Sequence, residues 1–277
     1  MAERFIDCHA HIIDPARFPF ADGPGYRPRL EETGTREAYC AMLDGLGATH
    51  ARLVQPSGYG VDNRAMLDAM SAIPGRLKAI AMVDPGAGDR TLEALAEAGI
   101  VGVRFNLPSY DPGALSRPEA PILLDRLRAL GLFAQVYADD AQWAAIAPIL
   151  RASRVRVLVD YFGVHDLAGG VGQPGFLAVL ALGREGQASV KLSAPFRLSS
   201  RPDTYGDLDA FVEALLGAFG PGACVFGSDW PFLGLRTRPD LGRVLKGLGR
   251  WLPDRRDRQR VLWDNPFRLF GFEGVRP

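Results

Sequence analysis

Ile6-Asp7-Cys8-His9-Ala10-His11, near the start of the chain, is the stretch on which the fold prediction depends. Phe5 and Ile6 form a short apolar run typical of a buried strand, and two histidines at positions i and i+2 follow it. In an extended chain, side chains at these positions lie on the same face. His9 and His11 are therefore expected to project into one space, to bind a metal ion or donate to a carbonyl oxygen. Two surface histidines at a strand exit are the alternative.

Eight apolar, strand-like runs alternate with helix-like segments along the chain. The expected strands span residues 5–8, 51–54, 77–83, 102–105, 133–137, 155–160, 188–192 and 224–226. The expected helices span residues 35–46, 62–72, 89–98, 120–130, 141–152, 175–182 and 208–219, and further helices complete the chain. Short apolar strands that alternate with helices indicate parallel strands buried on both faces. The pattern predicts an α/β protein, a single (β/α)8 TIM barrel domain over residues 1–277 with C-terminal helices.

An open, doubly wound sheet is the alternative fold. Such a sheet usually carries a Gly-rich phosphate-binding loop after its first strand. Here the two histidines and an irregular region rich in Pro and Gly, residues 14–34, follow the first strand instead. A loop of this length is often a lid or a binding loop, and this one carries Tyr26, Arg27 and Arg29.

The composition excludes several classes of partner. Lys+Arg and Asp+Glu both total 32, so no basic field indicates binding to nucleic acid or to a membrane surface. Cys8, Cys40 and Cys224 form no C-x-x-C pair, and the N-terminus has no apolar signal core. A reducing, cytoplasmic location is the simplest expectation. We expect a monomer or a small homo-oligomer that acts on a small molecule.

Polar residues follow each expected strand. Active sites of (β/α)8 barrels lie at the C-terminal ends of the strands, so these residues should converge on one rim. In strand order they are His9 and His11; Gln55 and Ser57; Asp84; Arg104 and Asn106; Tyr137 and Asp139; Asp160 and Tyr161; Lys191, Ser193 and Arg197; and Ser228, Asp229 and Trp230.

Asp229 lies in Gly227-Ser228-Asp229-Trp230-Pro231, where glycine and proline predict a sharp exit from the last strand. An acid held there could take a proton from water or bind a metal ion. The alternative is that Asp229 caps the helix that follows. Because the eighth strand closes a barrel beside the first, Asp229 is expected to lie near the two histidines.

Arg104 lies inside an apolar strand, where an arginine is costly unless it is paired. It could hold a substrate carboxylate in a bidentate fork, or pair with an internal acid. Arg197, after the seventh strand, could hold a carboxylate or face the solvent. Tyr137 and Tyr161 could donate phenolic hydrogen bonds or pack at the rim.

The motifs around His9 and Asp229 resemble those of the amidohydrolase superfamily, and more narrowly of the lactonase branch that includes 2-pyrone-4,6-dicarboxylate lactonase. Further matching segments run in order over nearly the whole chain: Phe18-Pro19-Phe20, Val54-Gln55-Pro56-Ser57, Val61-Asp62-Asn63, Val83-Asp84-Pro85, Gly102-Val103-Arg104-Phe105-Asn106 and Asp264-Asn265-Pro266-Phe267-Arg268-Leu269. The resemblance implies a TIM barrel and a hydrolase that opens a carboxylated lactone, in this branch often without a metal.

The resemblance also implies roles by position. Asp229 would be the base for water, and His9 and His11 would donate to the lactone carbonyl. Arg104 and Arg197 would hold substrate carboxylates. The remaining substrate-binding candidates are Tyr26, Ser57, Asn106 and Tyr137.

Two departures bear on the chemistry. Tyr161 stands where the pyrone lactonase has a histidine, although its hydroxyl can still donate to a carbonyl, so it remains a catalytic candidate. The loop Leu107-Pro108-Ser109-Tyr110-Asp111 lacks an arginine that this lactonase carries. For a metal, only His9, His11 and Asp229 are clear ligands. We therefore expect no cofactor, with a divalent metal as the less favoured case.

Three other functions fit the same residues. A lactone isomerase would use the same base on a substrate hydroxyl. A metal-dependent hydrolase or decarboxylase of the wider superfamily would bind an ion at the histidines. A binding protein on a barrel that has lost its activity would explain the tyrosine at position 161.

Overall fold

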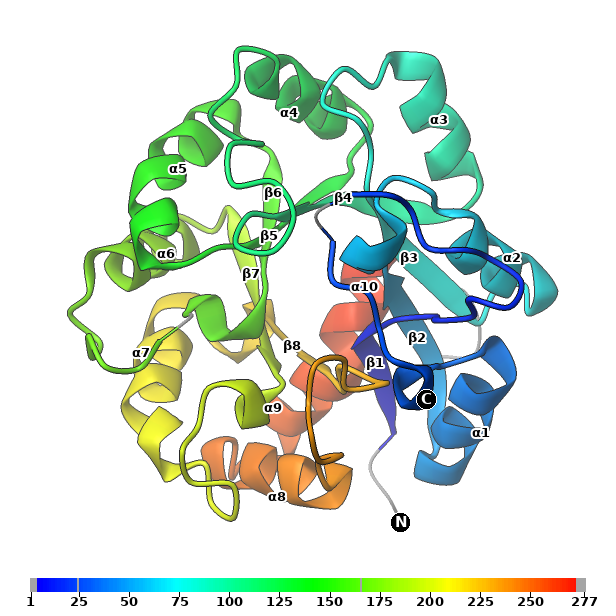
Figure 1. Cartoon of the computed structure of the whole chain (residues 1–277). Helices are drawn as coiled ribbons and strands as arrows, with labels where there is room; N and C mark the ends of the chain where they lie inside the picture. The colour runs from blue at the N-terminus through cyan, green and yellow to red at the C-terminus, as the bar shows by residue number, and fades with distance from the viewer. Residues whose placement is uncertain (1–3, 24, 165, 273–277) are drawn as a thin grey trace.

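The computed structural model describes residues 4–23, 25–164 and 166–272, and its strands form one parallel sheet in the order β1 to β8. The helices surround the strands (Figure 1). The strands are β1 (Phe5–Ala10), β2 (Ala48–Val54), β3 (Leu77–Ala81), β4 (Ile100–Asn106), β5 (Phe133–Tyr137), β6 (Arg156–Val159), β7 (Ala188–Ser193) and β8 (Cys224–Gly227). The predicted (β/α)8 barrel is confirmed.

Seven helices, α1 to α7, connect successive strands, and α8 to α10 follow β8 in the described part of the chain. They are α1 (Arg36–Leu46), α2 (Arg64–Ala72), α3 (Asp89–Glu97), α4 (Ala120–Ala129), α5 (Asp140–Ser153), α6 (Pro174–Arg184) and α7 (Asp209–Phe219), then α8 (Leu241–Trp251), α9 (Arg255–Gln259) and α10 (Asn265–Phe270). No helix among the described residues has the length and apolar character needed to cross a membrane.

Side-chain caps explain where two helices begin. The Thr35 hydroxyl accepts a hydrogen bond from the Ala38 amide and caps α1. Asp139 and Gln142 form a capping box at the start of α5, so two backbone N–H groups are satisfied reciprocally. The irregular region 14–34 contains one 3-10 turn, Leu30–Glu32, and its ends are joined by a bridge between Ile13 and Gly34.

Strands β1 and β2 are longer than the apolar runs predicted. β1 continues through His9 to Ala10, and β2 begins at Ala48 instead of Ala51. Hydrogen bonds of a parallel ladder do not depend on side-chain polarity, and polar side chains are tolerated where they face the barrel interior. The first histidine is therefore held inside the sheet itself.

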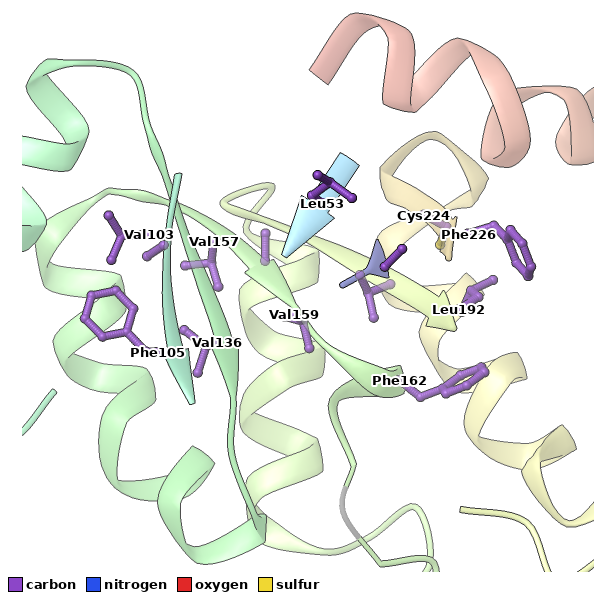
Figure 2. Close-up of a cluster of buried hydrophobic side chains, with 14 of the residues drawn as sticks. Leu53, Val103, Phe105, Val136, Val157, Val159, Phe162, Leu192, Cys224 and Phe226 are labelled. Carbon is purple, nitrogen blue, oxygen red and sulfur yellow. The ribbon is translucent and has the colours of Figure 1, made fainter. Parts of the chain in front are cut away.

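The outward faces of the strands form the main apolar core. Val103, Phe105, Val136 and Val159 are all buried, and Figure 2 shows them in the cluster between strands and helices. Because side chains alternate along a strand, the neighbours of Val103 and Phe105 on β4 face the barrel interior. This alternation directs Arg104 and Asn106 toward the site.

Hydrogen bonds around the ends of β1 and β8 close the barrel. The Asp229 amide donates to the His9 carbonyl at 2.7 Å, and the His11 amide donates to the Trp230 carbonyl at 2.8 Å. A Cβ atom at Gly227 would lie 2.6 Å from the His9 Cβ, so the close approach of the two strands requires glycine.

The buried Asp7 carboxylate links the two sides of this closure. It accepts hydrogen bonds from the Ser228 amide at 2.7 Å, the Ser228 hydroxyl at 2.5 Å and the Tyr39 hydroxyl at 2.9 Å. Burial raises the pKa of Asp7, and the hydrogen bonds from Ser228, His9 and Tyr39 oppose that shift. Asp7 thus connects β1, α1 and the loop after β8.

Replacing Asp7 tests this closure. Asp7→Ala leaves the buried donors of Ser228 and Tyr39 without their acceptor, so we expect the free energy of unfolding to fall by about 3 kcal/mol. Tyr39→Phe removes one donor only and should cost about 1 kcal/mol. Urea unfolding followed by circular dichroism measures both. A loss below about 0.5 kcal/mol in Asp7→Ala would show that the barrel closes without this carboxylate.

Candidate active site

A cavity of about 240 Å³ opens at the C-terminal ends of the strands. All six residues expected to bind substrate line it, namely Tyr26, Ser57, Arg104, Asn106, Tyr137 and Arg197. His11 and Tyr161 line it as well, while His9 and Asp229 are completely buried beside them. Its volume suits a small ligand, since pockets for drug-sized molecules are larger.

Asp229 follows β8 in the left-handed backbone region, with φ of 64°, and its carboxylate meets both histidines. Its Oδ1 lies 3.7 Å from His9 Nε2 and 3.8 Å from His11 Nε2. The Tyr161 hydroxyl donates to Oδ1 at 2.9 Å, and the Arg197 guanidinium donates to Oδ2. The expected convergence of His9, His11, Tyr161 and Asp229 is therefore present.

Arg197 is held by Asp229 and does not extend into solvent. Its Nη2 also donates to the Leu233 carbonyl at 3.0 Å, and its side chain is 24% exposed. Burial lowers the pKa of Arg197, but the Asp229 carboxylate outweighs this effect and the pKa is raised. Arg197 is therefore cationic at the cavity wall, and its Nε donates a hydrogen bond to Asp229.

The hydrogen bond of His11 defines its tautomer. Nδ1 lies 2.7 Å from the Val54 carbonyl oxygen, which can only accept, so Nδ1 carries the proton. Burial and the nearby Arg104 lower the pKa of His11 to about 3, so the ring is neutral at pH 7. Nε2 then presents a lone pair toward Asp229 and the cavity.

His9 contacts two further polar groups. Its Nδ1 lies 3.2 Å from Lys191 Nζ, and its Nε2 lies 3.2 Å from the Tyr161 hydroxyl. The Tyr161 ring stacks on the imidazole at a centroid distance of 4.9 Å. Burial and the charge of Lys191 lower the pKa of His9, so this ring is also neutral at pH 7.

Tyr161 is a protonated phenol in this environment. It is 5% exposed, and burial together with the Asp229 charge raises the pKa of its hydroxyl well above 10. It can therefore donate one hydrogen bond, which Asp229 accepts, while its oxygen accepts another. Tyr161 thus joins the first strand to the acid that follows the eighth.

A layer of buried polar side chains supports the site from below. Arg52 donates to Gln135 Oε1 at 2.7 Å, and Gln135 donates to Asp160 Oδ2 at 2.9 Å. Lys191 Nζ lies 2.6 Å from Asp160 Oδ1. We expected Lys191 and Asp160 at the rim without a specific role, and we did not predict Arg52 or Gln135. The signal was present, because Arg52 and Lys191 interrupt apolar strands as Arg104 does.

Arg104 is positioned from both sides. Nη1 donates to the Gln55 carbonyl at 2.9 Å, and Nε lies 3.9 Å from Asp160 Oδ2. The side chain is buried in the protein, yet Arg104 lines the cavity. It combines the two alternatives considered for it, because it lies near an internal acid and also reaches the cavity.

Glu32 joins two loops that line the cavity, a role the sequence did not predict. Its carboxylate accepts from the Tyr26 hydroxyl at 2.7 Å, from the Arg29 amide and guanidinium, each at 2.8 Å, and from the Gly234 amide at 2.7 Å. Tyr26 belongs to the irregular region 14–34 and Gly234 to the loop after β8. One buried acid therefore holds both walls in place.

His9, His11 and Asp229 are the candidate metal ligands of the site. Their candidate ligand atoms lie within 4.8 Å of one another, and two imidazoles with a carboxylate suit zinc. However, both Asp229 oxygens already accept hydrogen bonds, from Tyr161 and Arg197. Lys191 also lies against His9, and cationic groups disfavour a divalent ion. As arranged, the residues do not fit a resident divalent metal.

Comparisons with known proteins find similar sequences and structures over nearly the whole chain. The family model described as amidohydrolase matches residues 6–272. A 2-pyrone-4,6-dicarboxylate hydrolase of Comamonas testosteroni is 30% identical over 98% of this chain and 91% of its own length. A 4-sulfomuconolactone hydrolase of Rhizobium radiobacter is 29% identical over 96% of this chain and 89% of its own. The structure of a probable 2-pyrone-4,6-dicarboxylic acid hydrolase from Acinetobacter baumannii superposes with a TM-score of 0.86 at 28% identity, covering 98% of this chain and 100% of that one.

The role of Glu32 predicts a pH-dependent contribution to stability. Although burial opposes it, hydrogen bonds from Arg29, Tyr26 and Gly234 lower the pKa of Glu32 from 4.5 to about 2. The stabilisation is therefore complete above pH 4.5 and is lost as the pH falls toward 2. Glu32→Gln should lower the free energy of unfolding by about 2 kcal/mol at pH 7, and the deficit should shrink below pH 4.5.

The control for this variant is Glu31→Gln. Glu31 is exposed, with its side chain at 68% accessibility, and its substitution should change stability by less than about 0.5 kcal/mol. Urea midpoints at pH 7, 5 and 3.5 provide the comparison. A Glu32→Gln deficit that stays constant over this range would contradict the assigned pKa.

Proposed function

Because the chain belongs to the amidohydrolase family, we propose that it is a hydrolase that opens a small carboxylated lactone. The observation that carries the proposal is the meeting of Asp229, His9, His11 and Tyr161 at the floor of a cavity whose wall includes Arg104. Relatives named as hydrolases of a pyrone dicarboxylate and of a sulfomuconolactone support the substrate class.

Arg104 would bind the substrate carboxylate. The Gln55 carbonyl holds its Nη1, so the guanidinium is fixed before the substrate arrives. A guanidinium matches a carboxylate in geometry and charge, and burial strengthens the attraction. Ser57, Asn106 and Tyr137 line the same cavity and would contact the remaining polar atoms of the ring. Arg197 and Tyr26 would complete the binding surface.

Asp229 and His11 would hold the attacking water. Asp229 Oδ1 and His11 Nε2 are both acceptors, and one water can donate a hydrogen bond to each across their separation of 3.8 Å. Asp229 would take a proton as the water oxygen adds to the lactone carbonyl. We expected His11 to donate to that carbonyl, but a proton on its Nδ1 leaves it an acceptor, so the water is the better partner.

His9 and Tyr161 would stabilise the oxyanion. His9 Nε2 and the Tyr161 hydroxyl lie 3.2 Å apart beside Asp229. Once Asp229 is protonated it accepts more weakly, and the Tyr161 hydroxyl is released to donate to the oxyanion. This interaction would be stronger in the transition state than in the ground state, as catalysis requires.

Ring opening completes the balance of atoms. The carbonyl re-forms, the bond between its carbon and the ring oxygen breaks, and Asp229 returns its proton to that oxygen. Lactone and water thus give a ring-opened acid, whose new carboxyl group releases a proton at neutral pH. Every proton movement uses groups of this chain, and we infer that the reaction needs no metal.

Two further properties belong to the proposal. We infer that the chain forms one domain. We also infer that it acts in a reducing, cytoplasmic compartment, because Cys8, Cys40 and Cys224 form no disulfide. A substrate hydroxyl in place of the water would make the same site a lactone isomerase. Product NMR distinguishes the two, since only hydrolysis yields a ring-opened acid.

The experiment that tests the function is proton release by chelator-treated protein over a panel of lactones. The panel comprises pyrone dicarboxylate, muconolactones and sugar-acid lactones, with neutral lactones of the same ring size beside them. Release from one carboxylated class supports the proposal and identifies the substrate. Absence of release from every carboxylated lactone, before and after addition of zinc or manganese, would contradict it.

Asp229→Asn tests the base. An amide cannot take the water proton, so kcat should fall by about 10³-fold while the fold is kept. Asp125→Asn, in an exposed pair with Arg128 on α4, is the matched control and should leave kcat unchanged. Initial rates on the best lactone measure both variants. Near-wild-type turnover in Asp229→Asn would remove Asp229 from the role of base.

Arg104→Met tests the carboxylate contact. Loss of a buried charged hydrogen bond should raise KM for the carboxylated lactone by about 10- to 100-fold. A neutral lactone of the same ring should lose far less, because it has no group for the guanidinium. The surface substitution Arg128→Met serves as the control. Equal losses on acidic and neutral substrates would show that Arg104 does not bind the carboxylate.

A further inference from the structure

Lys191 lies between His9 and an acid that would otherwise face it. Its Nζ is 2.6 Å from Asp160 Oδ1 and 3.2 Å from His9 Nδ1, and all three side chains are fully shielded from solvent. The direct separation of His9 Nδ1 and Asp160 Oδ1 is 3.6 Å, which is too long for a hydrogen bond. His9 Nδ1 therefore interacts with the lysine in preference to the carboxylate.

This order reverses the usual relation of an acid to a histidine. A carboxylate beside Nδ1 accepts a hydrogen bond from it, so the ring normally carries its hydrogen on Nδ1 and a lone pair on Nε2. As an ammonium paired with Asp160, Lys191 has only donors, so its nitrogen donates to Nδ1. A neutral imidazole has one N–H, so that proton must then lie on Nε2.

We propose that Lys191 is a positioning residue that fixes His9 in the Nε2–H tautomer. The Nε2 proton points to the Tyr161 oxygen at 3.2 Å, and the Tyr161 hydroxyl donates to Asp229 at 2.9 Å. Hydrogen bonds then run in one direction, from Lys191 through His9 and Tyr161 to Asp229. His9 and His11 hold opposite tautomers, so one is a donor and the other an acceptor at the same cavity floor.

The tautomer gives His9 a function that its sequence motif does not specify. With hydrogen on Nε2, His9 can donate to an oxyanion but offers no lone pair to a metal ion there. Lys191 would thus favour hydrogen bonding by His9 and His11 over metal binding. The inference rests on the proposed function only for the identity of the oxyanion, because the tautomer itself is a property of the free protein.

The test is 15N NMR of protein labelled at histidine, measured without substrate. The wild-type spectrum should show His9 protonated at Nε2 and His11 at Nδ1. In Lys191→Met the side chain cannot donate, so His9 should change to Nδ1–H facing Asp160. Lys191→Arg keeps a donor and should keep the Nε2–H form, and Lys246→Met, at an exposed position of α8, should change nothing.

Two results would overturn the inference. One is a wild-type spectrum in which His9 is protonated at Nδ1. This result is obtained with the wild-type protein alone and does not depend on whether any variant folds. The other is a Lys191→Met spectrum in which His9 keeps its proton on Nε2. If no lactone reacts, the proposed function is contradicted, but the tautomer seen in the spectrum of the free protein is unaffected. The two proposals can therefore be contradicted independently.

Zinc affinity provides a second readout. Lys191→Met would free the Nε2 lone pair of His9 and remove a neighbouring amine, so zinc should bind about 10- to 100-fold more tightly than in wild type. Competition with a fluorescent chelator measures this ratio. Equal affinity in the two proteins would show that Lys191 does not govern metal access.

Discussion

The Asp7 carboxylate is the contact on which the geometry of the site depends. His9 and His11 belong to the first strand and the loop after it, whereas Asp229 follows the last strand, so they meet only if the barrel closes. Hydrogen bonds pair each strand with the next from β1 to β8. The barrel then closes through backbone hydrogen bonds near His9 and through the hydrogen bonds that Ser228 donates to Asp7. A buried acceptor with several donors is costly to remove, and it makes this closure specific.

Once the barrel is closed, His9 and His11 lie side by side but have different hydrogen-bond partners at Nδ1. A backbone carbonyl directs the proton of His11 to Nδ1, and a lysine nitrogen contacts Nδ1 of His9. In and below the cavity floor, four basic side chains also outnumber three carboxylates: Arg52, Arg104, Lys191 and Arg197 against Asp7, Asp160 and Asp229. In a buried site with low dielectric constant, this excess favours an anion over a divalent cation.

Much of this arrangement could be predicted from the sequence, because barrel topology brings every strand end to one rim. Three sequence features predicted residues that lie at the cavity. They are the H-x-H spacing, the position of Arg104 within an apolar strand, and the segment from Gly227 to Pro231 around Asp229. Lys191 and Asp160 were expected at the rim, but their links through Arg52 and Gln135 were not. An apolar run such as Ala51-Arg52-Leu53-Val54 locates a strand without specifying which face its polar side chain occupies. The roles of Glu32 and of the two tautomers depend on backbone groups distant in sequence, such as Gly234 N and Val54 O, and no local pattern specifies these contacts.

In the proposed reaction, Asp229 directs a water molecule onto the carbonyl of a carboxylated lactone without a metal. The most direct measurement is mass spectrometry of the product formed in 18O-labelled water by chelator-treated protein. We expect one heavy oxygen in the new carboxyl group, and we expect added zinc to leave the rate of its formation unchanged. A product without the label would indicate attack by a substrate hydroxyl, and turnover that requires zinc would contradict the metal-free account.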